Sequence, residues 1–86
     1  HTHAIYSIDW NNITGLIATG AGDNSVKFLS YSHSSDGCGI LNEKYKYQNA
    51  HTGDVNCVRW NPISEYSNIL LTCGDDGDVK IWTIQI

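Results

Sequence analysis

The chain has 86 residues, of which 41% are hydrophobic and 16% charged, and its formal net charge is −4. It contains no Met and begins at His1, so we expect a piece of a longer protein. No apolar run approaches the roughly 20 residues that a membrane-spanning helix needs. The excess of acidic side chains disfavours nucleic-acid binding, which depends on Lys and Arg at phosphates. We therefore expect a folded protein that binds neither membranes nor nucleic acids.

Short segments rich in β-branched and aromatic residues alternate with Gly, Asn and Asp, which is typical of antiparallel strands joined by tight turns. In chain order, strands are predicted over residues 5–10, 16–19, 25–30, 44–48, 55–60, 69–73 and 79–84, and no helix is predicted. Asn24 and Asp76-Gly77 supply residues that tolerate the positive φ of tight turns. The polar segment from Ser30 to Gly39 is predicted to be a loop. The expected fold class is all-β.

The three cysteines, Cys38, Cys57 and Cys73, include no CxxC pair. Cys57 and Cys73 alternate with apolar neighbours, and a free cysteine behaves as a small hydrophobic residue. We therefore predict that both are buried and that the protein works in a reducing compartment.

Two segments contain residue types that bind metals. The segment His1-Thr2-His3 could bind Cu²⁺ or Ni²⁺ through nitrogens in a square plane if its α-amine is free, but that amine would be an artefact of a cut chain. Three aspartates lie between residues 75 and 78, but the alternating order and the distal Glu of a calcium loop are missing, which favours a solvated turn. No metal ligand and no cofactor are therefore predicted.

The chain contains an internal repeat. Two pairs of segments align, residues 1–11 with 51–61 at an offset of 50, and residues 17–28 with 70–81 at an offset of 53. The length difference falls in a polar stretch after Trp60, where a loop absorbs it at little cost. We predict two repeats, over residues 1–50 and 51–86.

Four positions recur with similar spacing in both copies. The second copy holds His51, Thr72, Asp76 and Trp82. The first copy holds His1, Thr19 and Asp23, with Leu29 at the Trp position. This order, in a repeat of about 40 to 45 residues, resembles the WD-repeat (WD40) family of β-propellers. The resemblance implies two partial blades of a propeller.

The residue types at these four positions are chemically complementary. In a four-stranded blade, the connection that carries His51 and the turn that carries Asp76 lie at the same end. The Asp76 carboxylate can accept from one imidazole nitrogen, and the other can engage the Thr72 hydroxyl. That hydroxyl can accept from the Trp82 indole N–H. Such a satisfied chain would fix the strand register and the turn geometry.

The alternative interpretation of the same residues is a hydrolase triad, with Thr72 as nucleophile, His51 as base and Asp76 as the orienting group. Threonine is a poor nucleophile away from a chain N-terminus, and no oxyanion-hole glycine motif accompanies it. We therefore predict no catalytic residues and no enzyme activity.

Longer matches point to one family of WD-repeat proteins. Residues 5–10, 16–23, 50–62 and 75–79 resemble the last two blades of the cytosolic iron–sulfur protein assembly WD-repeat family. That family implies a seven-bladed, non-catalytic scaffold that helps to deliver iron–sulfur clusters to apoproteins in the cytoplasm, with the nucleus as a second compartment. It implies iron–sulfur targeting factors and the remaining blades as partners, and a last blade that lacks its outer strand. Leu29 and the polar insert depart from the pattern, and a WD-repeat adaptor of another complex is the alternative.

Under this resemblance, function lies in a surface that binds other proteins. The end of the blades that carries the His and Asp turns is expected to expose Thr2, His3, Gly22, Thr52, Gly53, Asp54 and Asp75. The alternative for each of them is a solvated position without a partner, because only a minority of interface residues carry binding energy. Asp54 and Asp75 make this rim acidic, which implies a basic patch on the partner.

Overall fold

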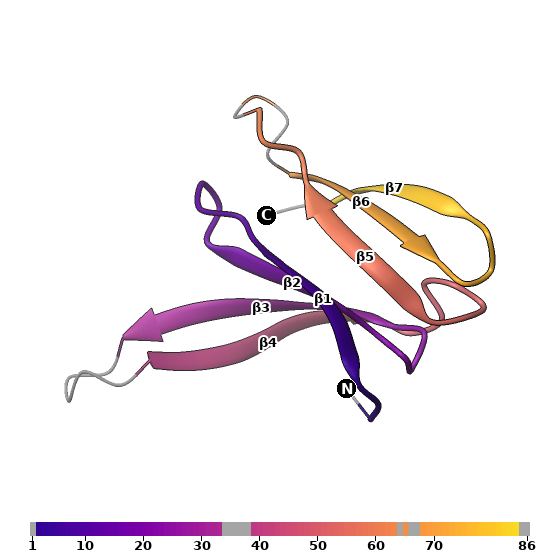
Figure 1. Cartoon of the computed structure of the whole chain (residues 1–86). Coiled ribbons are helices and arrows are strands. Elements are labelled where there is room, and N and C mark those ends of the chain that lie inside the picture. The colour runs from indigo at the N-terminus through magenta and orange to yellow at the C-terminus, as the bar shows by residue number, and fades with distance from the viewer. Residues whose placement is uncertain (1, 34–38, 64, 66–67, 85–86) are drawn as a thin grey trace.

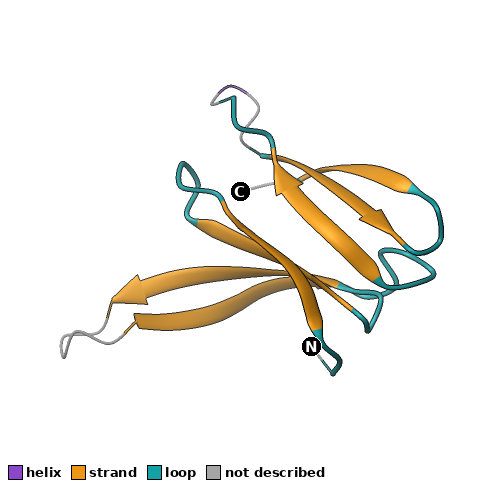
Figure 2. Ribbon diagram, viewed as in Figure 1, coloured by secondary structure: helices purple, strands orange, loops and turns teal. Residues whose placement is uncertain are grey.

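The computed structural model describes residues 2–33, 39–63, 65 and 68–84, which form two antiparallel sheets (Figures 1 and 2). The first sheet has the order β1-β2-β3-β4, with strands β1 (Ile5–Trp10), β2 (Leu16–Ala21), β3 (Val26–His33) and β4 (Gly39–Tyr47). The second has the order β5-β6-β7, with strands β5 (Val55–Trp60), β6 (Ile69–Gly74) and β7 (Val79–Thr83). The described residues contain no α-helix, and Glu65 lies in a short 3₁₀ turn. The predicted all-β fold class is confirmed, and this part of the chain holds no apolar helix long enough to cross a membrane.

The tight turns occur where the sequence supplies residues that accept a positive φ. Asn24, between β2 and β3, has a φ of 65°, and Gly77, between β6 and β7, has a φ of 79°. In each turn an amide donates back to the preceding strand, from Asn24 to the Ala21 carbonyl at 3.2 Å and from Gly77 to the Gly74 carbonyl at 3.1 Å. Most other side chains are disfavoured at such φ values. Both predicted turns are therefore confirmed.

The polar segment after residue 30 differs from the prediction. β3 continues to His33 and β4 begins at Gly39, so the predicted loop over residues 30–39 is wrong at both ends. Residues 34–38 lie outside the described residues. The strands extend this far because they remain paired, with Tyr31 opposite Leu41. Polar residues are tolerated in such a hairpin because an antiparallel sheet can present one face to water.

The core lies between the two sheets. It is formed by buried apolar residues, Leu16, Ala18, Val26, Phe28, Ala50, Val55, Val58, Trp60, Leu70 and Ile84. The Phe28 ring lies 5.7 Å from Tyr47 and 5.8 Å from Trp60, measured between centroids. Tyr47 also stacks on Trp82 at 5.4 Å. Since Phe28 and Tyr47 belong to the first sheet and both tryptophans to the second, these contacts hold the sheets together.

Side chains of β1 also accept hydrogen bonds from the edge of β5. The Val58 amide donates to Ser7 Oγ at 3.1 Å, and the Trp60 amide donates to the Asp9 carboxylate at 2.7 Å. The Trp60 indole N–H donates to the Asp9 backbone carbonyl at 3.1 Å. These bonds satisfy amides of an edge strand that have no partner strand. The packing of the sheets is thus specified by polar contacts as well as by the apolar core.

Candidate functional site

The side chains of His51, Thr72, Asp76 and Trp82 meet at one end of the second sheet. His51 precedes β5, Thr72 lies on β6, Asp76 lies in the β6–β7 turn and Trp82 lies on β7. Imidazole Nδ1 lies 3.0 and 3.1 Å from the two Asp76 carboxylate oxygens, and Nε2 lies 2.8 Å from Thr72 Oγ1. The Trp82 indole N–H donates to the same hydroxyl at 2.9 Å. The structure thus joins these residues, the tetrad, into one continuous chain of hydrogen bonds.

The two ends of the tetrad determine the direction of donation. An indole N–H can only donate, and an ionised carboxylate can only accept. With a neutral imidazole, His51 therefore donates from Nδ1 to Asp76 and accepts at Nε2 from the Thr72 hydroxyl, which itself accepts from Trp82. The His51 and Thr72 side chains are 0% and 1% exposed. A fully satisfied network at this depth fixes the elements that carry it in one arrangement.

Asp76 also organises the backbone around the turn. One carboxylate oxygen accepts the Thr52 amide at 2.9 Å, and the other accepts the Asp78 amide at 3.0 Å. The bond from the Asp78 amide, assisted by Thr52 and His51, lowers the pKa of Asp76 well below its ordinary value, although burial opposes the shift. The ionised carboxylate therefore ties the β6–β7 turn to the connection that precedes β5.

The β2–β3 turn of the first sheet repeats this use of a carboxylate. Asp23 accepts the Thr2 amide at 3.1 Å, the Ser25 amide at 3.2 Å and the Ser25 hydroxyl. Partial burial raises the pKa of Asp23, but these hydrogen bonds outweigh it and lower the pKa below its ordinary value. The first turn is thus tied to the connection before β1, as the second turn is tied to the connection before β5.

Beneath the first turn, the Thr position of the tetrad is kept and the Trp position is changed. Thr19 is buried on β2, at the position that corresponds to Thr72. Leu29 lies on β3 where the second sheet has Trp82. His1, the remaining residue that the sequence assigns to this group, lies outside the described residues.

The burial of His51 and Thr72 argues against the hydrolase alternative. A nucleophilic hydroxyl must reach a substrate, but Thr72 Oγ1 is buried and already bonded to His51 and Trp82. In the described part of the chain, no three His, Cys, Asp or Glu side chains are grouped so that they could hold a metal ion. The burial and the two hydrogen bonds of the Thr72 hydroxyl favour a structural role for these residues.

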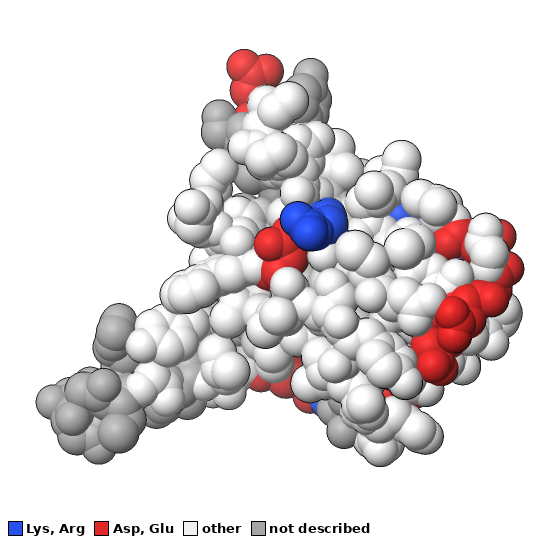
Figure 3. Space-filling model, in the orientation of Figure 1, with Lys and Arg blue, Asp and Glu red and all other residues white. Residues whose placement is uncertain are grey.

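The residues of the predicted rim surround the two turns. Four are exposed, Thr2, His3, Thr52 and Asp75, and three are half-buried, Gly22, Gly53 and Asp54. The Asp75 amide donates to the Asp54 carbonyl at 2.9 Å, which brings the two acidic residues together. Figure 3 shows acidic side chains gathered over the end of the second sheet that carries the β6–β7 turn. The rim is thus acidic at the second sheet, whereas at the first it presents Thr2 and His3.

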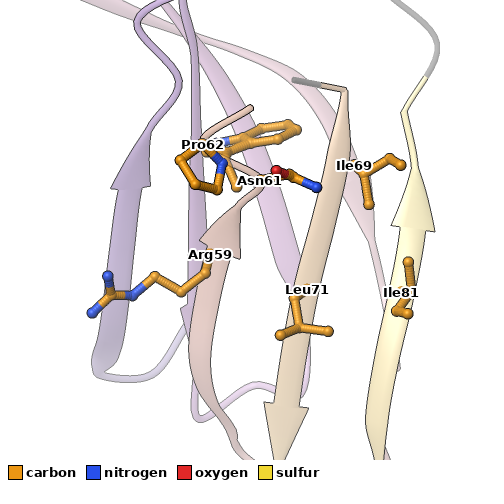
Figure 4. A pocket seen from close by; sticks show the side chains of 7 residues that line it. Arg59, Asn61, Pro62, Ile69, Leu71 and Ile81 are labelled. Atoms are coloured by element: carbon orange, nitrogen blue, oxygen red, sulfur yellow. The ribbon is translucent and has the colours of Figure 1, made fainter. Parts of the chain in front are cut away.

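A groove on the outer face of the second sheet has no counterpart in the sequence-based predictions. It has a volume of about 390 Å³ and is lined by Arg59, Trp60, Asn61, Pro62, Ile69, Leu71 and Ile81 (Figure 4). Leu71 is 44% exposed and Ile81 is 72% exposed. The signal in the sequence was that β6 and β7 carry apolar residues on both faces, which is typical of a strand covered on both sides.

The positions of the two described cysteines correct the prediction of burial. Cys57 and Cys73 are free thiols, and both are half-buried. The alternation of side chains along β5 and β6 turns them away from the core side, where Val58 and Thr72 are buried. Apolar neighbours in sequence therefore did not predict burial, because strand neighbours point to opposite faces.

Both repeats match a known family. A sequence model of the family described as "WD domain, G-beta repeat" (WD40) matches residues 1–30 and 42–83. The chain belongs to the WD40 family. The second match begins within β4 and runs to the end of β7, so a WD40 sequence repeat combines the last strand of one sheet with three strands of the next. The predicted resemblance to WD-repeat propellers is confirmed.

Named WD40 relatives align with nearly all of the chain. Identity is 46% over 89 residues with the "probable cytosolic iron-sulfur protein assembly protein CIAO1 homolog" of Dictyostelium discoideum. It is 38% over 86 residues with the "probable cytosolic iron-sulfur protein assembly protein ciao1" of Xenopus tropicalis, and 40% over 86 residues with the similarly named protein of Drosophila mojavensis. Each alignment covers 99% of this chain and 25% of the relative. The chain therefore spans about a quarter of the length of these relatives.

Proposed function

We propose that this WD40 segment belongs to a non-catalytic protein-interaction scaffold that acts in the assembly of cytosolic iron–sulfur proteins. The observation that carries this proposal is the 38–46% identity, over 99% of the chain, with proteins named for that process. The partners are iron–sulfur targeting factors, and the location is the cytoplasm, extending to the nucleus.

The same proposal includes residues 1–50 and 51–86 as successive repeats of a seven-bladed ring. Strands β2 and β3 pair in the same register as β6 and β7, with Thr19 opposite Lys27 and Thr72 opposite Lys80. The outer faces of both sheets carry exposed apolar residues, such as Trp10 on the first. The remaining blades of the ring would cover such faces.

Depletion of the full-length protein that contains this chain tests the assignment to iron–sulfur assembly. Cytosolic iron–sulfur enzymes should lose activity, mitochondrial iron–sulfur enzymes should keep theirs, and re-expression should restore the cytosolic activities. Enzyme assays in cell extracts measure both classes. Unchanged cytosolic activities would contradict the proposal and favour the alternative, an adaptor in another complex.

We further propose that the acidic part of the rim binds the partner. Asp75 is exposed and Asp54 is half-buried, whereas His51 and Thr72 beneath them are buried. Reversal of both charges, by Asp54→Lys with Asp75→Lys, should weaken partner binding about tenfold through lost electrostatic complementarity. The free energy of unfolding should change by about 0.5 kcal/mol or less, as for other surface substitutions.

Co-purification with the full-length protein, quantified by mass spectrometry, measures this effect on binding. The matched control is Glu43→Lys with Glu65→Lys, because both glutamates are exposed, lie outside the rim and give the same change in net charge. Equal losses of partners in the two double variants would remove the case for the rim.

A further inference from the structure

A pocket lies where the two sheets meet, at the opposite end of the strands from the rim. Its walls come from the β1–β2 turn and the β5–β6 loop, which lie side by side at the top of Figure 1. We propose that this pocket binds a cationic side chain, of lysine or arginine, from a partner protein. The site is distinct from the rim, and its chemistry does not depend on a role in iron–sulfur assembly.

Both walls of the pocket belong to this chain. Asp9 lines it from β1, Asn12 and Ile13 line it from the β1–β2 turn, and Asn61 and Pro62 line it from the β5–β6 connection. In a propeller, such strand-end turns stay at the surface, whereas neighbouring blades cover the faces of the sheets. The volume is about 260 Å³, below the roughly 300–1,000 Å³ of pockets that enclose a whole small-molecule ligand. The size therefore fits one side chain of a partner.

Hydrogen bonds hold both walls in place. In the first wall, Asn11 Oδ1 accepts the amides of Ile13 and Thr14, at 3.0 and 3.1 Å. In the second wall, Asn61 Oδ1 accepts the amide of Ile63 at 3.0 Å. A pocket with walls that are already ordered loses little conformational entropy when a ligand enters, which favours binding.

Asp9 supplies the charge of the pocket. Its Oδ2 accepts the Trp60 amide at 2.7 Å, which fixes the orientation of the carboxylate. Its Oδ1 accepts no hydrogen bond from the residues that the structure describes. Every buried side-chain nitrogen or oxygen of these residues has a hydrogen-bond partner, so Oδ1 reaches solvent. The pocket therefore presents an oriented, half-buried carboxylate with one oxygen available to a ligand.

The rest of the lining favours a cation with an apolar stem. None of the other described residues that line the pocket is charged. Ile13 is 54% exposed and Pro62 is exposed, so both offer apolar surface to methylene groups. Lysine and arginine combine such methylene groups with N–H donors. Since a hydrogen bond from a cation to a carboxylate is about twice as strong as one between neutral groups, a cationic side chain complements this pocket.

The acidic position belongs to this junction and not to the repeat pattern. The offset of 50 that aligns the two repeats places Arg59 at the position of Asp9. Arg59 lines the groove on the outer face of the second sheet and does not line this pocket (Figure 4). Asp9 forms no ion pair with any residue in the described part of the chain. A cation from outside the chain can therefore pair with it.

Peptide titration of the full-length protein that contains this chain tests the proposal. The probes are the arginine tripeptide acetyl-Gly-Arg-Gly-amide and its citrulline counterpart, which has nearly the same shape but no charge. The reporter is the Trp60 indole N–H, which donates to the Asp9 carbonyl at 3.1 Å and is assigned in ¹H–¹⁵N spectra with Trp60→Phe. We expect the arginine tripeptide to shift this signal with a Kd on the order of 1 mM, and the citrulline tripeptide to leave it in place. Equal shifts with both peptides, or no shift with either, would overturn the proposal.

Two variants separate the carboxylate in the pocket from the net charge of the protein. Asp9→Asn keeps an acceptor for the Trp60 amide but removes the charge, so it should weaken binding of the arginine tripeptide about fivefold or more. The matched control is Glu43→Gln, which removes an exposed carboxylate on β4 and should leave binding unchanged. Equal affinities in the two variants would contradict the proposal.

An exposed position provides the same test without altering Asp9. Asn12 is exposed and lines the pocket, so Asn12→Lys brings a competing cation to it and should also weaken binding of the arginine tripeptide. Circular dichroism shows whether each variant is folded. Unchanged binding in a folded Asn12→Lys protein would count against the site. These titrations contain no partner of the proposed scaffold, so their failure is distinct from a failure of the assignment to iron–sulfur assembly.

Discussion

The β2–β3 turn and the β6–β7 turn share one backbone design and differ in the residues beneath it. In each, an Asp carboxylate accepts the amide two residues later and an amide from the connection before the sheet. Beneath the second turn, Trp82 donates to Thr72, which is bonded to His51. Leu29 occupies the Trp82 position in the first repeat and has no group that can donate. The carboxylate is therefore the shared element, and the indole is an addition that couples β7 to the second turn.

The largest effect is expected when the tetrad is interrupted at its centre. The substitution His51→Ala leaves the buried Thr72 hydroxyl and the Asp76 carboxylate without their shared partner and creates a cavity, so it should lower the free energy of unfolding by about 3 kcal/mol. Urea unfolding followed by circular dichroism measures the change. The control His3→Ala removes an exposed imidazole and should cost about 0.5 kcal/mol or less. Similar losses in the two variants would show that the tetrad does not stabilise the sheet.

A smaller effect is expected when the second turn is made to resemble the first. The substitution Trp82→Leu removes the donor to Thr72 and the stacking on Tyr47, and should cost about 2 kcal/mol. The matched control is Trp10→Leu, because Trp10 is 59% exposed and makes one tilted contact with Tyr31. It should cost about 1 kcal/mol or less, measured by the same urea unfolding. A larger loss at Trp10 would contradict the role assigned to the indole of Trp82.

The smallest effect is a difference in pH dependence between the two turns. The pKa of Asp76 is lower in the folded state than in the unfolded state, so the ionised carboxylate stabilises the fold. This stabilisation is complete above the unfolded-state pKa of about 4. It is lost as pH falls through the lowered folded-state pKa. The substitution Asp76→Asn should therefore flatten the acid side of the stability profile. Asp23→Asn should flatten it less, because burial is the strongest single influence on Asp23 and opposes the lowering.

Thermal unfolding between pH 7 and the acid limit of the folded state, recorded for both variants and the unmodified chain, measures these slopes. If Asp76→Asn leaves the slope of stability against pH on the acid side unchanged, that result contradicts the prediction. It would show that the hydrogen bonds at this turn do not lower the pKa of the Asp76 carboxyl.

Much of this protein could be predicted from the order of residues along the chain. The repeat, the all-β class and the turns at Asn24 and Gly77 depend on local conformational preference, which neighbouring residues carry. The tetrad was predictable because His51, Thr72 and Asp76 have equivalents at matched spacing in the first repeat. In addition, its carboxylate, hydroxyl and two ring N–H groups can satisfy one another as a chain of hydrogen bonds. Spacing and complementary chemistry were sufficient to predict these contacts because all four residues lie within one repeat.

Other features depended on how strands and sheets are placed in three dimensions. Residues 31–33 and 39–43 are strand because two polar segments pair with each other, and polarity alone indicated a loop. Asp9 accepts hydrogen bonds from Trp60, and Cys57 lies opposite Cys73 with both thiols half-buried, because of packing and register. A strand's alternation shows which residues share a face, but not which face is covered. Only the position of the neighbouring sheet decides that, since burial is a property of the assembled layers.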